Sequence, residues 1–93
     1  MQKVGANSKK GRAMQLDLFN KLDSAFPGKF MFDRGIWPTN KRNDSIQPII
    51  IAEYNFPYVE EGFRLIVSNS SHTGGLFYLG TFDEMVAEIR KWL

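Results

Sequence analysis

The C-terminal stretch, residues 76–93, constrains the fold most, because it predicts a strand that turns directly into a helix. Residues 76–79 (Leu-Phe-Tyr-Leu) are typical of a buried strand, and Gly80 ends it. Thr81 and Glu84 have the spacing of a capping box, in which each side chain accepts a hydrogen bond from the other residue's backbone N–H. Apolar residues then recur on one helical face: Met85, Val86, Ile89, Trp92 and Leu93. Such a helix has to lie back across its own sheet.

The residues before this stretch predict another helix and further strands. A helix is expected from about Arg12 until Pro27-Gly28 stops it, since Met14, Leu18, Leu22 and Phe26 recur every four residues. Strands are expected over 29–33, 46–54 and 63–68, and residues 34–45 read as a long polar loop. Consecutive strands joined by reversals predict an antiparallel sheet of three to four strands with both helices on one face. The expected fold class is α+β, in the order αββββα.

The chain has 93 residues, which suffice for one domain with a modest core. Residues 1–11 are small, polar and basic, and we expect them to form a flexible arm. Residues 12–93 are expected to form a single α+β domain. The expected core consists of apolar residues from every element: Leu18, Leu22, Ile49, Ile51, Leu65, Val67, Phe77, Leu79, Val86 and Ile89.

The residue types that are missing argue against an enzyme. There is no cysteine, so disulfides, thiol nucleophiles and cysteine-ligated metals are excluded. The one histidine, His72, lies in a Ser/Thr/Gly-rich turn without a placed acid or nucleophile. No apolar run would span a bilayer or serve as a secretory signal. We therefore expect a cytoplasmic, non-catalytic binding module that needs neither metal nor cofactor.

The distribution of charge favours nucleic acid as the partner. The net charge is only +2, but residues 1–45 hold nine Lys/Arg against four Asp (+5), and residues 46–93 hold three against six acids (−3). The residues expected to contact phosphates lie in the arm and in the 34–45 loop: Lys9, Lys10, Arg12, Lys41 and Arg42. Trp37, in the same loop, is expected to stack a base. The alternative is that these residues are ordinary solvated surface.

A second hypothesis is a protein partner. Tyr54, Phe56 and Tyr58 are spaced by two, so they would share one face of an extended segment, and Glu60 and Glu61 would form its acidic rim. An exposed face of this kind would suit an inhibitor or accessory factor of phage or mobile-element type. The alternative is that these rings cover one edge of the core. An exposed edge strand, either the first or the last, would also allow two copies to pair as a homodimer.

One short stretch resembles a catalytic family. Residues 48–55 (Pro-Ile-Ile-Ile-Ala-Glu-Tyr-Asn) resemble the apolar strand of PD-(D/E)xK nucleases, in which an acid and then a lysine follow the run. The resemblance implies an upstream aspartate that helps to bind Mg²⁺, here Asp33 or Asp44. Asn55 stands where that family has its water-activating lysine. A Mg-dependent nuclease-like fold is therefore kept as a remote alternative.

Overall fold

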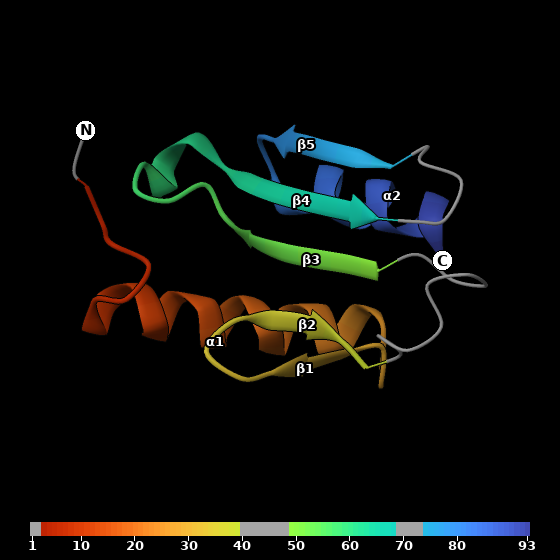
Figure 1. Ribbon diagram of the computed structural model, residues 1–93, viewed down its shortest axis with the longest axis horizontal. Coiled ribbons are helices and arrows are strands. Elements are labelled where there is room, and N and C mark those ends of the chain that lie inside the picture. Colours follow the sequence, from red (N-terminus) through yellow and green to blue (C-terminus); the bar gives the residue numbers. More distant parts are fainter. Residues whose placement is uncertain (1–2, 40–48, 69–73) are drawn as a thin grey trace.

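The computed structural model describes residues 3–39, 49–68 and 74–93. Two α-helices, a short 3₁₀ helix and five strands follow one another along the chain: α1 (Lys9–Ala25), β1 (Phe30–Phe32), β2 (Ile36–Pro38), β3 (Ile49–Tyr54), η1 (Val59–Glu61), β4 (Phe63–Ser68), β5 (Gly75–Leu79) and α2 (Phe82–Trp92). The strands form one antiparallel sheet in the order β1-β2-β3-β4-β5 (Figure 1). The expected α+β class is confirmed.

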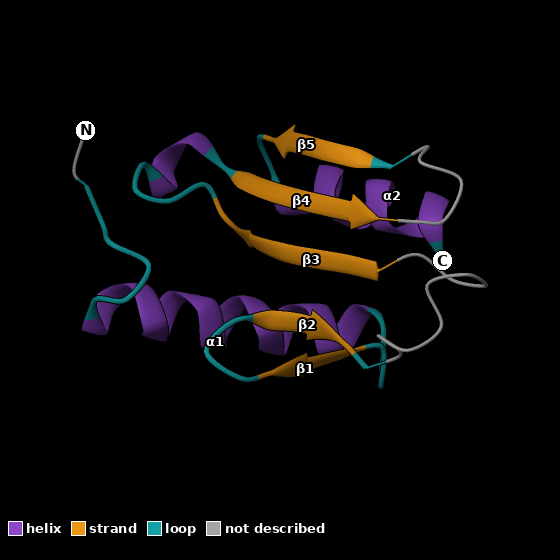
Figure 2. Cartoon of the chain, in the orientation of Figure 1, coloured by secondary structure: helices purple, strands orange, loops and turns teal. Residues whose placement is uncertain are grey.

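The molecule has two layers, because both helices lie on the same side of the sheet (Figure 2). Their inward side chains, Leu18 and Leu22 from α1 and Met85 and Ile89 from α2, join one core cluster with the strands. The strands contribute Phe30, Ile36, Ile50, Ala52, Leu65 and Val67. No described element covers the opposite side of the sheet. Among the described residues, no helix is long and apolar enough to cross a membrane.

Helix α1 begins at Lys9, earlier than the expected start at Arg12. The Ser8 hydroxyl caps it by accepting the Gly11 N–H at 3.0 Å, so Lys9 and Lys10 belong to the first helical turn. Before the helix, Val4 is buried and its N–H donates to the Pro57 carbonyl at 2.8 Å. The flexibility expected of residues 1–11 stays a prediction.

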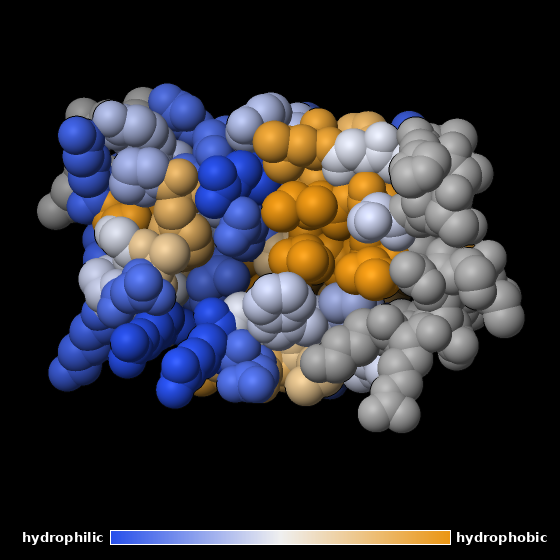
Figure 3. Space-filling model, viewed as in Figure 1, coloured by the Kyte–Doolittle hydropathy of each residue, from blue (hydrophilic) through white to orange (hydrophobic). Residues whose placement is uncertain are grey.

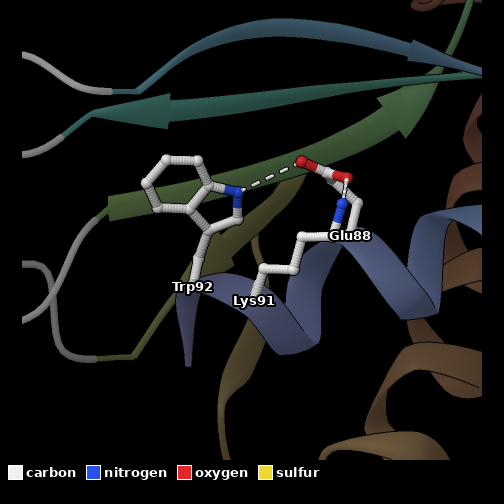
Figure 4. A network of polar contacts seen from close by, with 3 residues as sticks. All are labelled: Glu88, Lys91 and Trp92. Atoms are coloured by element: carbon white, nitrogen blue, oxygen red, sulfur yellow. Dashed lines mark hydrogen bonds and ion pairs between the residues drawn. The ribbon is translucent and has the colours of Figure 1, made fainter.

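Helix α2 has the predicted N-cap. The Thr81 hydroxyl accepts the Glu84 N–H at 3.1 Å, whereas the Glu84 carboxylate accepts from Gly80 N at 3.2 Å rather than from Thr81. Near its end, Glu88 accepts hydrogen bonds from Trp92 Nε1 at 3.4 Å and Lys91 Nζ at 3.1 Å (Figure 4). The Trp92 ring lies 6.0 Å from that of Phe77 on β5, centroid to centroid. The contact between Phe77 and Trp92 packs α2 against the last strand.

The strand that sequence patterning missed is β2, which lies inside the expected 34–45 loop. Three residues are too few to show a periodicity, and Gly35 before the strand and Pro38 at its end read as loop signals. The β1–β2 turn places Arg34 in the left-handed region, at φ 60°. The only described register pair between β2 and β3 is Ile36 with Ala52, so the sheet opens beyond it. Beyond this pair, the Tyr54 N–H of β3 donates to the side chain of Gln15, a buried residue of α1, at 3.1 Å.

The face that β3 turns to the core was predicted wrongly. Ile50 and Ala52 are buried, whereas the expected Ile49 and Ile51 point to the other side of the sheet. Four consecutive apolar residues carry no alternation, so the pattern could not choose the side. On α2, Met85 is fully buried in place of the expected Val86. The other expected core residues are buried or pack against the cluster.

Candidate functional site

The side of the sheet away from the helices, here called the open face, carries an apolar row that crosses all five strands. One residue comes from each strand: Met31, Trp37, Ile51, Ile66 and Leu76. Met31 is opposite Trp37, Ile51 opposite Ile66, and Ile66 opposite Leu76. Trp37 comes beside Ile51 because Ile36 is opposite Ala52. Residues in register on one face are in side-chain contact range, so the row is continuous.

Much of this row is accessible to solvent. Trp37 is 41% exposed, Ile66 37% and Leu76 50%. The space-filling view, taken from this side, shows hydrophobic atoms gathered over the neighbouring strands (Figure 3). Single exposed apolar residues are ordinary, but a continuous apolar patch on a small domain is typical of an interaction surface. The apolar row is therefore the first candidate site.

A second row lies beside the apolar row and contains the charges of the open face. Glu53, Arg64 and Tyr78 are in register on β3, β4 and β5. Arg64 Nη2 lies 2.8 Å from Glu53 Oε1, so these two charges compensate each other. Arg64 Nε is buried without an acceptor among the described residues. Tyr78 is the most exposed of the large hydrophobic residues on this face, at 65%.

Trp37 is held in place by the β1–β2 turn. Its indole Nε1 donates to the Asp33 carbonyl at 3.1 Å. A Cβ atom at Gly35 would lie 3.2 Å from the same nitrogen, which explains a glycine at this position. A large aromatic side chain that is fixed before binding loses little entropy when a partner covers it.

The second candidate site is a hollow between the start of α1 and the β1–β2 turn, here called the arginine hollow. Its volume is about 720 Å³, and its lining combines polar and apolar side chains: Ala6, Asn7, Arg12, Ala13, Gln15, Leu16, Phe32 and Arg34. None of the described residues that line it is acidic. Arg12 and Arg34 take part in no ion pair among the described residues. The hollow is therefore lined by two guanidinium groups that no described carboxylate pairs with.

The two candidate sites are neighbours. A smaller cavity of about 240 Å³ shares Ala6, Asn7, Gln15 and Arg34 with the arginine hollow. It also reaches Trp37, Ile51 and Ile66 of the apolar row. Arg34 therefore lies between the arginine hollow and the open face.

The residues expected to bind nucleic acid come together only in part. Lys9 and Lys10 are exposed on the first turn of α1, and Arg12 lines the arginine hollow. Trp37 lies on the open face rather than in a loop. Lys41 and Arg42 lie outside the described residues. Sequence reasoning missed Arg34, although an Arg-Gly pair between two short aromatic runs indicates a tight turn that presents its arginine.

The aromatic stretch is half-buried. The Tyr54 ring lies 4.9 Å from that of Phe63 and 6.1 Å from that of Phe56. Burial, and to a smaller extent the charge of Asp17, raises the pKa of Tyr54 above its ordinary value of 10.0. Tyr58 has Lys3 Nζ 5.8 Å from its ring centroid.

The acidic residues that follow the aromatic stretch, Glu60 and Glu61, are exposed on η1. The acidic rim is therefore accessible to solvent, whereas the aromatic rings of residues 54–58 are half-buried.

The residues of the nuclease resemblance have other partners. Glu53 is paired with Arg64, and Asn55 Nδ2 donates to Glu61 Oε2 at 3.4 Å. Asp33 is exposed at the β1–β2 turn. Asp44 and His72 lie outside the described residues. Within the described ranges, no three His, Asp or Glu side chains gather as a metal ion would require.

No protein-family model, curated protein or solved structure matched the chain. What the chain does is therefore inferred from the open face and the arginine hollow.

Proposed function

We propose that this chain is a non-catalytic binding module that docks a protein partner on its open face, as an inhibitor or accessory factor would. The observation that supports the proposal is the continuous apolar row from Met31 to Leu76. Trp37 of this row, and Arg64 and Tyr78 in the row beside it, are of the types that dominate binding energy in protein interfaces.

The chemistry of the face favours a protein over a polyanion. The charged residues that the structure describes on this face, Glu53 and Arg64, compensate each other, so this described part offers phosphates no net attraction. Its aliphatic residues offer contact area rather than hydrogen bonds. The expected occupant is an apolar ridge on another protein, with an acceptor or polar group beside Arg64. This surface replaces residues 54–58 as the preferred protein-binding site.

The test compares two lysine substitutions. Ile66→Lys places an ammonium group in the middle of the apolar row, and Leu93→Lys makes the same change at an exposed position on the end of α2. Immobilised wild-type chain and the Leu93→Lys variant should capture the same protein from a lysate, and the Ile66→Lys variant should not. With that protein purified, Ile66→Lys should weaken binding at least about tenfold, because an unpaired charge is buried. Equal binding by both variants would refute the proposal.

Nucleic acid is the second candidate, and the arginine hollow favours it. Arg12 and Arg34 both line this hollow and pair with no described acidic residue, and Lys9 and Lys10 lie on the same end of α1. Phosphates bound there would be contacted without base readout, so affinity would show little dependence on sequence. Trp37, reached through the smaller cavity, would stack one base.

This second candidate has its own test. Deleting residues 1–11 would also remove the buried Val4 and the Ser8 cap and so disturb the fold. Single substitutions test the charges without this side effect. Arg34→Asn removes the charge and tolerates the left-handed backbone, and Lys21→Gln removes a charge elsewhere on α1. Binding of short single-stranded and duplex nucleic acid should fall steeply with salt and weaken with Arg34→Asn but not with Lys21→Gln. Absence of binding at low salt would exclude it.

A further inference from the structure

Strand β5 lies at one end of the sheet, and no strand that the structure describes pairs with its edge away from β4. The backbone bonding of the sheet can be followed strand by strand. Asn55 N donates to Gly62 O at 2.9 Å, toward β4, and Tyr54 N points the other way, to Gln15. Backbone groups alternate direction along a strand, and Tyr54 is opposite Phe63. Phe63 and every second residue after it therefore bond to β5.

The same alternation fixes β5. Phe63 is opposite Leu79, Leu65 opposite Phe77, and Val67 opposite Gly75, so these β5 residues bond to β4. Leu76 and Tyr78 must then direct their N–H and C=O groups away from the sheet. No described strand pairs with that edge, and none lies beyond it in Figure 1.

Within the described residues, the β5 edge lacks the features that usually protect an edge strand. Its sequence, Gly-Leu-Phe-Tyr-Leu, contains neither a proline nor a charged residue. All five residues are in regular register with β4. The opposite edge, β1, has only three residues. Leu76 and Tyr78, the β5 residues with outward backbone groups, are also 50% and 65% exposed.

We propose that β5 pairs with β5 of a second copy of this chain, antiparallel, about a two-fold axis at Phe77. This register places Leu76 opposite the partner's Tyr78, and the partner's Leu76 opposite Tyr78. These are the residues whose backbone groups point outward, so both pairs form complete reciprocal hydrogen bonds. A register displaced by one residue would place inward-directed groups at the junction.

Side chains on both sides of the junction fit the same two-fold arrangement. On the open face, each Leu76 side chain packs beside a tyrosine ring, a favourable cross-strand pair. On the helix side, the two Phe77 rings approach each other next to Trp92, which already lies 6.0 Å from Phe77. Equivalent residues contact one another, as a closed two-fold interface requires. The pairing would double the open face without occupying it.

The test is amide hydrogen exchange on the wild-type chain at low and high micromolar concentrations, with the mass in solution measured alongside. The mass should rise to that of two chains, and the Leu76 and Tyr78 amides should gain protection as concentration rises. The amides of Phe77 and Leu79, which bond to β4, should be protected at both concentrations and serve as the internal control. Tyr78→Pro should abolish dimerisation by removing an outward N–H, whereas Tyr78→Phe should keep it.

Other results would overturn this inference. A single-chain mass with rapid exchange at Leu76 and Tyr78 at all concentrations excludes the pairing. A dimer in which these amides stay unprotected must use another surface. Protection that needs a different protein would mean that the edge takes a partner's strand instead. Ile66→Lys separates this inference from the proposed function, since it should remove partner docking on the open face while leaving the dimer intact.

Discussion

Arg64 on β4 and Glu53 on β3 form an ion pair across neighbouring strands, with Arg64 Nη2 2.8 Å from Glu53 Oε1, on the side of the sheet that no described helix covers. The pair leaves the described part of the open face without net charge beside its apolar row. Because both side chains are more than a quarter exposed, solvent screens their attraction.

The ion pair should therefore contribute little to stability. In a double-mutant cycle with Arg64→Met and Glu53→Gln, the coupling free energy of unfolding should be about 0.2–1 kcal/mol and should shrink with salt. Urea unfolding of the wild type, both single variants and the double variant measures it. A coupling of several kcal/mol would mean that the pair is shielded from solvent and that the open face is covered.

The core side of α2 should be sensitive to truncation at one position and tolerant at the next. Met85 is fully buried and Val86 is only partly buried. Met85→Ala should lower the free energy of unfolding by about 2–5 kcal/mol, and Val86→Ala by clearly less. Chemical denaturation distinguishes them. Equal losses would contradict the helix orientation described here.

Both helix N-caps should make a measurable contribution to the free energy of unfolding. Ser8→Ala and Thr81→Ala each remove a hydroxyl that accepts a backbone N–H, from Gly11 and Glu84 respectively. Each should cost about 1 kcal/mol of unfolding free energy. Ser24→Ala, an exposed serine inside α1, is the matched control and should cost nothing, because alanine favours helix. A cost at Ser24 similar to that at the caps would argue against the capping assignment.

Gln15 should contribute to the stability of the fold, because it accepts the Tyr54 N–H where β2 no longer pairs with β3. Gln15→Met keeps the length of the side chain but leaves this N–H without an acceptor, so about 1–3 kcal/mol of stability should be lost. The Tyr54 amide should also exchange faster. Unchanged protection at Tyr54 would show that another group satisfies it.

Stability should fall at alkaline pH through Tyr54. Its pKa is raised in the folded state, mainly by burial and also by Asp17, so the folded chain holds the phenol proton more tightly than the unfolded chain. This contribution is fully present below the ordinary value of 10.0 and is lost as pH rises through the folded-state pKa. Tyr54→Phe should reduce the alkaline loss relative to the wild type. An identical pH profile for the variant would exclude this role.

The elements with a clear period or cap were predictable from sequence. The spacing of Leu18 and Leu22 indicated α1, and Thr81 with Glu84 indicated the start of α2, since both signals are local. The start of α1 was missed because Ser8 precedes a Lys-Lys-Gly stretch with no apolar period. The strand β2 was missed because it is too short to alternate.

The open face could not be predicted, because it depends on which side of β3 meets the helices. A run of isoleucines reads alike on both sides, and the side becomes visible only in the register with β4 and in the buried Ala52, which is opposite Ile36 of β2. Trp37 was expected at a nucleic-acid site because basic residues lie close to it in the sequence. Its alignment with Ile51 and Ile66 arises only when the strands pair.

The most direct test of the open face as a protein-docking surface is site-specific photo-crosslinking in cells. A photoreactive phenylalanine analogue replaces Trp37 on the open face or, as a matched control, Asn20 on the exposed side of α1. We expect a discrete protein adduct from position 37, none from position 20, and loss of the adduct when Ile66→Lys is added. Adducts to nucleic acid from position 37, or the same proteins from both positions, would contradict the assignment.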